Sequence, residues 1–217
     1  MLRISLIGPG DIDFHYYELL RLNQKKFQLE LEKIAKTLSK LDVALELLPD
    51  KGICIEIAKL YKRFGGKEVI GTAPLSDKTF GISHIQEHID TKINGKFLFD
   101  RIIDSGDWFK HDLIKGLFGN VIFYLGASPG TDGERHYAVY LYKLIKKFKE
   151  GVEVTGKKIH QEIYADNNFS ILVYSPFLIK KKLPKEDEEY MKKFGINFFY
   201  IKSSKQLKEK LNELTNK

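Results

Sequence analysis

The chain has 217 residues, of which 43% are hydrophobic, and this composition is typical of a globular protein with a sizeable core. Its apolar runs are too short to cross a bilayer and its single cysteine, Cys54, excludes an internal disulfide, so we expect a cytoplasmic protein without a membrane partner. The net charge is +7, and lysines of the C-terminal part, such as Lys180, Lys181 and Lys182, supply much of the excess. These lysines either attract anionic partners or form a solvated surface. Because no pattern of an RNA-binding module accompanies them, nucleic acid is the least favoured partner.

The first half of the chain alternates strand-length apolar runs with helical patterns. We expect strands over residues 2–7, 43–48, 68–73 and 97–103, and helices over 25–41 and 53–64. The second helix should end at Gly65-Gly66, because glycine tolerates the left-handed closing conformation. Segments 11–22 and 76–96 show no clear period, apart from a short helix expected around 84–88.

The second half continues the alternation. We expect helices over 108–117, 137–148 and 185–194, a final helix that Ser203 caps and that runs to 214, and strands over 121–125, 171–175 and 196–201. Residues 149–168 are ambiguous, with one or two helical turns possible at 159–164. Strands that alternate with helices imply right-handed crossovers. The sequence therefore predicts one Rossmann-like α/β domain over 1–217, a three-layer fold with a mostly parallel sheet of about seven strands.

The most informative turn is Gly-Ala-Ser-Pro-Gly-Thr-Asp-Gly-Glu at 126–134, directly after an apolar strand. Its small residues are Gly126, Ala127, Ser128 and Gly130. Small residues let a phosphate approach the backbone, and the N-terminus of the following helix attracts anions. Thr131 adds a hydroxyl, and Glu134 would stand beside whatever the phosphate carries. The alternative is an ordinary strand-to-helix turn in which Thr131 or Asp132 caps the helix, since short glycine motifs recur by chance.

Other turns should reach the same edge of the sheet, because the carboxyl ends of parallel strands gather there. Gly8-Pro9-Gly10 follows the first strand and is either part of the site or a plain turn. The spacing of Asp11, Asp13 and His15 fits no standard zinc or calcium loop, so we predict no metal site. His111 is either an acid or base, since imidazole titrates near neutrality, or a surface histidine without a role. We expect Cys54 to be a small core residue.

The turn at 126–134 resembles the signature Pro-Gly-Gly-x-Gly-Thr-x-x-Glu of the LOG-like family, and it keeps Gly130, Thr131 and Glu134. This family includes cytokinin-activating phosphoribohydrolases and proteins labelled lysine decarboxylases, and the related molybdenum-cofactor carrier proteins share its architecture. A second similarity covers 52–71, where a glycine turn, a helix, Gly-Gly and a Val-Ile-Gly strand follow one another. The similarity thus extends over most of the chain.

The resemblance implies a Rossmann-like protein that binds a nucleoside 5'-monophosphate or a related phosphoribosyl compound as a homodimer, without a cofactor. Phosphate would lie on residues 126–131, with Gly8, Gly10 and Gly52 nearby and Glu134 near the ribose or the glycosidic bond. In the hydrolases an Arg-Lys pair precedes the signature strand. Here these positions hold His111 and Asp112, with Lys110 adjacent, so His111 or Lys110 would replace the arginine in holding phosphate.

Two functions stay open. One is hydrolysis of an N-glycosidic bond, with Glu134 and His111 as catalytic residues. The other is a non-catalytic carrier or sensor of a phosphorylated ligand. The choice is open because a neutral histidine does not reproduce the permanently charged, bidentate grip of an arginine on phosphate. Whether the protein is an enzyme therefore does not follow from the sequence.

Overall fold

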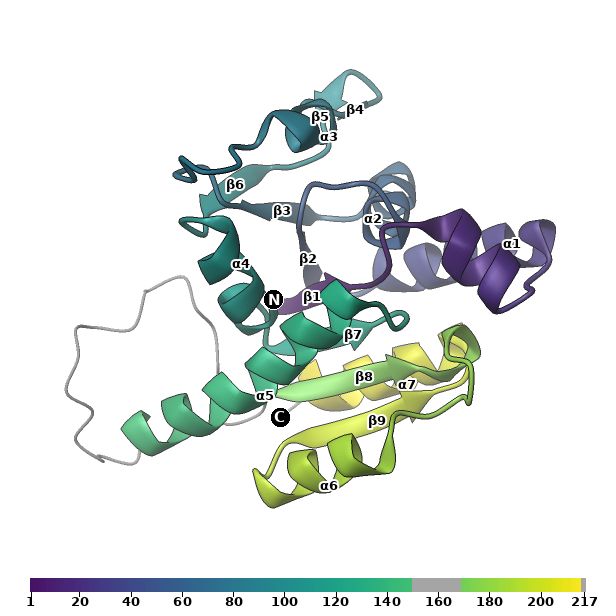
Figure 1. The fold of residues 1–217 in the computed structure, drawn as a ribbon. Coiled ribbons are helices and arrows are strands. Elements are labelled where there is room, and N and C mark those ends of the chain that lie inside the picture. The colour runs from purple at the N-terminus through teal and green to yellow at the C-terminus, as the bar shows by residue number, and fades with distance from the viewer. Residues whose placement is uncertain (150–168, 216–217) are drawn as a thin grey trace.

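The computed structural model describes residues 1–149 and 169–215, which contain a seven-stranded sheet in the order β6-β3-β2-β1-β7-β8-β9 (Figure 1). The strands are β1 (Leu2–Ile7), β2 (Val43–Leu47), β3 (Glu68–Ala73), β6 (Arg101–Asp104), β7 (Val121–Tyr124), β8 (Ser170–Tyr174) and β9 (Asn197–Ile201). Every neighbouring pair is parallel. The predicted three-layer α/β fold is confirmed.

Helices cover both faces of the sheet (Figure 1). One face carries α1 (Gln24–Leu38), α2 (Ile53–Arg63) and α7 (Ser204–Thr215). The other carries α4 (Trp108–Ile114), α5 (Pro129–Lys149) and α6 (Lys185–Lys193). The central strands β2 and β7 are buried along their whole length, which explains their near-continuous apolar sequences.

The short elements correct several predictions. The expected strand at 97–103 is wrong in its first half, because Phe97 belongs to a hairpin of β4 (Lys92–Ile93) and β5 (Lys96–Phe97), and β6 begins only at Arg101. Asn94 and Gly95 both have positive φ, the conformation that tight hairpin turns require.

Segment 11–22, which has no clear period, contains a π-helix, η1 (Asp13–Leu19). Segment 76–96 contains η2 (Ser83–Ile85) and α3 (Gln86–Ile89), as expected around 84–88.

Residues 137–148 continue a helix as expected, and this helix, α5, begins at Pro129, so the small-residue turn runs directly into it. The helical turns expected at 159–164 lie outside the described residues. Two further short helices, η3 (Lys115–Phe118) and η4 (Ser175–Phe177), follow α4 and β8.

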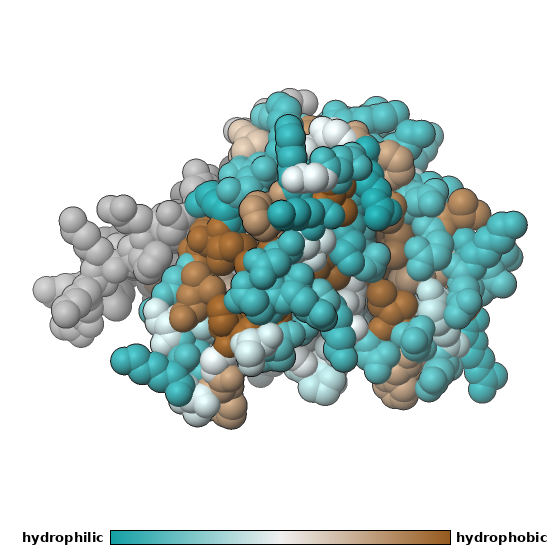
Figure 2. All heavy atoms as spheres, turned by 90° about the horizontal axis from the view of Figure 1, so that it is seen from above, coloured by the Kyte–Doolittle hydropathy of each residue, from teal (hydrophilic) through white to brown (hydrophobic). Residues whose placement is uncertain are grey.

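The surface seen from above is largely hydrophilic, with apolar side chains in scattered groups (Figure 2). Among the described residues, no helix combines the length and the apolar character that a bilayer span requires. The exposed aromatic side chains include Phe80, Phe97 and Phe109.

The order of the strands reverses between β1 and β7, which lie side by side with Ile7 opposite Tyr124. The chain leaves β1 toward one face of the sheet and leaves β7 toward the other. In sheets of this kind the diverging turns leave a crevice beyond the carboxyl ends of the strands. The turns after β1 and β7 therefore border this crevice.

Candidate functional site

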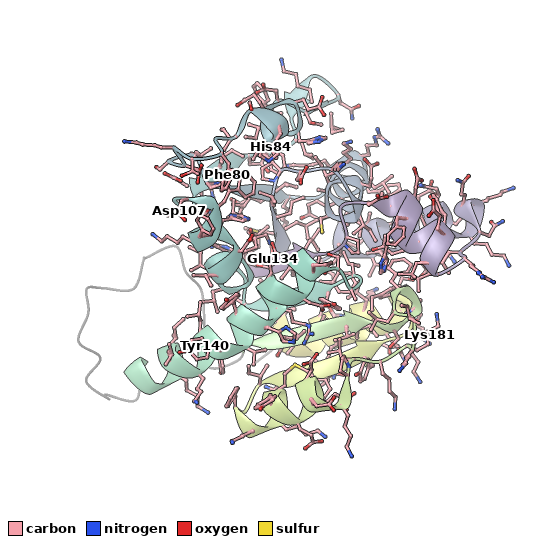
Figure 3. All side chains as sticks on the ribbon, viewed as in Figure 1. Phe80, His84, Asp107, Glu134, Tyr140 and Lys181 are labelled. Atoms are coloured by element: carbon pink, nitrogen blue, oxygen red, sulfur yellow. The ribbon has the colours of Figure 1, made fainter. Side chains whose placement is uncertain are left out.

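A cavity of about 190 Å³ opens at this crevice. The turns after β1, β2 and β7 form its wall, together with residues of α4 and η3. Of the predicted site residues, it brings together Gly8, Gly10, Ser128, Gly130, Thr131 and Glu134. Glu134 lies on the first turns of α5, between this helix and α4 (Figure 3). Lys51, which sequence reasoning did not select, is an exposed cation at the same cavity.

The N-terminus of α5 is capped by the side-chain hydroxyls of Ser128 and Thr131. Each hydroxyl oxygen accepts a hydrogen bond from the backbone N–H of the other residue. Ser128 Oγ accepts a hydrogen bond from the Thr131 N–H at 3.3 Å, and the Ser128 N–H donates to Thr131 Oγ1 at 2.7 Å. This is a capping box with Ser128 as the N-cap and Pro129 at the first helical position. The alternative in which Thr131 or Asp132 is the N-cap is thus wrong. The Gly130 N–H, in the first turn, has no helical acceptor and borders the cavity.

The carboxyl group of Glu134 borders the cavity and is partly buried. Loss of solvent raises its pKa to about 7, with Asp112 and Glu46 acting in the same direction and Lys115 acting against them. The carboxyl group of Glu134 therefore lies at the cavity wall near one positive group, Lys115, and two acidic ones, Asp112 and Glu46. That a ligand binds beside Glu134 stays a prediction.

Lys115 is a cavity residue that sequence reasoning missed. Its side chain is 1% exposed, and Nζ donates to the Leu6 carbonyl at 3.2 Å and to Glu46 Oε2 at 3.1 Å. Glu46 also accepts hydrogen bonds from the hydroxyls of Ser5 and Thr72. Burial disfavours the charged lysine, but Glu46 and Glu134 outweigh it and raise the pKa. The sequence feature that could have pointed to Lys115 is its position as a single lysine within the otherwise apolar run at 113–118.

His111 is completely buried, so the alternative of a surface histidine is wrong. Its Nδ1 lies 2.8 Å from Ser105 Oγ, whereas Nε2 has no hydrogen-bond partner. Burial, together with the positive charge of Lys115, lowers the pKa of His111 to about 3. The imidazole is therefore neutral at physiological pH, and it supplies no charge for a phosphate. Its neighbour Asp112 is exposed and lines the cavity.

No family model matches this chain, and no curated protein matches its sequence. Solved structures do match. The molybdenum cofactor carrier protein of Chlamydomonas reinhardtii superposes with a TM-score of 0.59 at 16% identity, over 100% of this chain and 99% of that one. The molybdenum cofactor binding protein of Rippkaea orientalis gives 0.57 at 13% identity, over 99% and 97%. The structural genomics target TM1055 gives 0.57 at 13% identity, over 98% and 99%.

This chain has the fold of the molybdenum cofactor carrier proteins. The similarity covers nearly the whole length of both chains, and it agrees with the resemblance that the turn at 126–134 carries. At these identities the likeness concerns the carrier-protein fold alone.

Two predicted glycines support the cavity of this carrier-protein fold without lining it. Gly52 has a φ of +116°, and a Cβ there would lie 2.5 Å from Gly10 Cα. Gly126 has a φ of +156°, and a Cβ there would lie 2.8 Å from His15 Nε2. Both positions require glycine because the turn after β1, with Pro9 and Gly10, packs against their backbone.

The remaining predicted residues lie elsewhere. Lys110 is exposed on α4 and, like His111, does not line the cavity. Ala127 lines a neighbouring cavity of about 610 Å³ that also contains the buried Arg135. Arg135 is paired with Asp187 at 2.7 Å and with Asp132 at 3.3 Å.

The structure also shows the surroundings of Cys54 and His15. Cys54, expected in the core, is partly exposed at the wall of the first cavity. Burial raises the pKa of its thiol, so it is not a nucleophile at neutral pH. His15 is buried with Nε2 3.3 Å from the Phe177 carbonyl, and it forms no metal-binding group with Asp11 and Asp13 among the described residues.

Proposed function

We propose that this protein binds a phosphate-bearing ligand of the nucleotide type in the cavity between β1 and β7 and acts as a carrier or sensor of it. The observation that carries the proposal is the cavity itself, which lies where the strand order reverses and borders the N-terminus of α5. Phosphate is attracted to such a helix start. The structural neighbours include proteins named as carriers or binders of a molybdenum cofactor, which supports a carrier role.

The size of the cavity indicates which part of the ligand it takes. At about 190 Å³ it is smaller than the roughly 300–1,000 Å³ of sites that enclose a drug-sized ligand. We infer that the phosphate and the adjoining sugar enter, while the base lies outside. The phosphate would meet the Gly130 N–H and the Lys51 ammonium group, since Lys115 is already paired with Glu46.

A pair of glycine substitutions tests the binding site. A Cβ at either Gly130 or Gly133 meets no atom within 4 Å, so both positions accept a side chain, but only Gly130 lines the cavity. Gly130→Asp places a carboxylate where phosphate would bind, and we expect at least a tenfold loss of affinity for nucleoside monophosphates in calorimetry. Gly133→Asp is the matched control and should bind like the unchanged protein. Equal affinity in both variants, or no binding of any monophosphate by the unchanged protein, contradicts the proposal.

A second candidate function is hydrolysis of the N-glycosidic bond of a nucleoside 5'-monophosphate. It is favoured by the position of Glu134 in the cavity wall, where a carboxylate would stabilise positive charge that develops on the ribose. Incubation with monophosphates should then release free base and ribose 5-phosphate, and Glu134→Gln should abolish the release. Binding without release supports the carrier function alone.

We also propose that the protein is a homodimer. Tyr137, Tyr140 and Leu144 are exposed at helical spacing on one face of α5, and a second copy of this chain would cover them. Light scattering of the unchanged protein should give twice the monomer mass. Tyr140→Lys should shift the population toward monomer, whereas a monomeric unchanged protein contradicts the proposal.

A further inference from the structure

Three potential metal ligands converge where α4 meets α5. His111 and Asp112 lie on α4, Glu134 lies on α5, and one ligand atom from each lies within 4.8 Å of the others. Figure 3 shows Glu134 on the side of α5 toward α4. Two of these residues, Asp112 and Glu134, also line the cavity. The group therefore joins a buried imidazole to a solvent-accessible wall.

The imidazole of His111 has an unsatisfied nitrogen. It is completely buried, and Nε2 has no hydrogen-bond partner, although leaving a buried polar atom unpaired is costly. The other nitrogen, Nδ1, is held by Ser105 Oγ at 2.8 Å, and Ser105 is itself buried. A histidine ligand of a metal has this arrangement, in which a fixed hydrogen bond at one nitrogen orients the other.

The charges around the group favour a cation. The group contains two carboxyl groups, those of Asp112 and Glu134, and Lys115 lies at the same cavity wall. Because Lys115 is already bonded to Glu46 at 3.1 Å, the pair Asp112 and Glu134 has no cation within salt-bridge distance among the described residues. A divalent ion would balance these two carboxylates.

We propose that His111, Asp112 and Glu134 bind one divalent transition-metal ion at the wall of the cavity. One imidazole with two carboxylates suits ions such as Zn²⁺ or Mn²⁺ better than Mg²⁺ or Ca²⁺, which prefer oxygen ligands alone. Ligand atoms about 2.0–2.2 Å from one ion lie roughly 3 Å apart, so the side chains have to close on the ion. Asp112 is exposed, so its side chain has room for this closure.

The remaining coordination positions of the ion would face the cavity, since Asp112 and Glu134 form part of its wall. An oxygen of a bound phosphate or a water molecule would occupy them. The metal site itself does not depend on the proposed nucleotide ligand. Only this last step, contact between the ion and a phosphate, rests on the proposed function.

Calorimetry with Zn²⁺ and Mn²⁺ on the chelator-treated full chain, without nucleotide, tests the site. We expect one ion per chain, bound at least tenfold more tightly than Mg²⁺. Asp112→Asn and Glu134→Gln each remove a charged ligand atom while keeping the shape of the side chain, and each should weaken binding roughly 10- to 100-fold. Ser105→Ala should weaken it about tenfold, because the imidazole loses the hydroxyl that orients it.

Asp13→Asn is the matched control, because Asp13 is an exposed carboxylate outside the group and should leave the affinity unchanged. The proposal is overturned if the double variant of Asp112 and Glu134 binds as tightly as the unchanged protein, if Asp13→Asn weakens binding equally, or if Mg²⁺ binds as well as Zn²⁺. Nucleotide binding measured in excess chelator reports on the proposed function separately.

Discussion

Lys115 Nζ lies 3.1 Å from Glu46 Oε2 at the wall of the cavity, and both side chains are almost completely withdrawn from solvent. Each charge is tolerable only because of the other, since burial of an unpaired charge is far more costly than burial of a pair. The lysine also holds the start of η3 against β1, because its Nζ donates to the Leu6 carbonyl. It is therefore part of what shapes the cavity.

Lys115→Met leaves Glu46 buried without a cation. We expect the free energy of unfolding to fall by about 3–5 kcal/mol, measured by urea denaturation. The double variant Lys115→Met with Glu46→Gln removes both charges. The new amide oxygen can accept from one of the Ser5 and Thr72 hydroxyls, and the amide NH2 can donate to the other. This double variant should recover most of the loss, and a double variant as unstable as the single one would disprove the pairing argument.

Thr131→Val keeps the shape of the side chain and removes the hydroxyl that bonds the Ser128 N–H and the Gly126 carbonyl. We expect a loss of about 1–3 kcal/mol in the free energy of unfolding, because these backbone groups lose a partner in a buried turn. Thr79→Val is the control at an exposed threonine and should stay within about 0.5 kcal/mol of the unchanged protein.

Gly52→Ala should destabilise the protein by more than about 1 kcal/mol, because the residue has positive φ and its Cβ would lie 2.5 Å from Gly10 Cα. Gly133→Ala should have the opposite sign and stabilise by up to about 1 kcal/mol, since it lies within α5 and a Cβ there meets no atom within 4 Å. Thermal melts of the two variants against the unchanged protein measure both effects. Equal shifts would refute the steric argument.

Asp77 organises the loop before α4. Its Oδ1 accepts hydrogen bonds from the backbone of Thr79, Phe80 and Gly81, and its Oδ2 accepts one from Trp108. Loss of solvent alone would raise the pKa of this carboxyl, but the backbone donors prevail and lower it. A lowered pKa means that the stabilisation is present above the pKa of the unfolded chain and is lost as the pH falls through the lower, folded value.

Asp77→Asn should therefore lower the melting temperature at pH 7, and the difference from the unchanged protein should shrink as the pH falls below about 4. Trp108 is the single tryptophan of the chain, and its fluorescence reports the loop directly. A difference between the two proteins that stays constant from pH 7 to pH 3 would contradict this prediction.

Much of the fold was predictable because buried apolar residues recur along the chain with the period of the helix or strand that they belong to. Strands β1 and β3 have the predicted bounds, since each is an apolar run between turn residues. The start of α5 was placed slightly late, after residue 130 instead of at Pro129, because Gly130 and Gly133 are poor helix formers. At the first helical position, however, proline is favourable, and a Ser-x-x-Thr capping box compensates for the glycines.

The site was only partly predictable for a related reason. Gly8, Gly10 and the turn at 126–131 could be assigned to one edge of the sheet, because parallel topology brings the carboxyl ends of strands together. Lys115 and the burial of His111 were not predictable, since a charged or polar residue in an apolar segment looks the same in sequence whether it faces solvent or a buried partner. Their environment depends on Glu46 and Ser105, which other elements bring to them.

The sequence by itself determined how the main strands and helices follow one another along the chain and where the glycine turns lie, because these follow from local periodicity and backbone preference. Only the tertiary structure decided which side chains share the cavity wall, that Lys115 is paired and that a nitrogen of His111 is left without a partner. Such contacts join residues far apart in the chain, and they depend on packing geometry that no local pattern records.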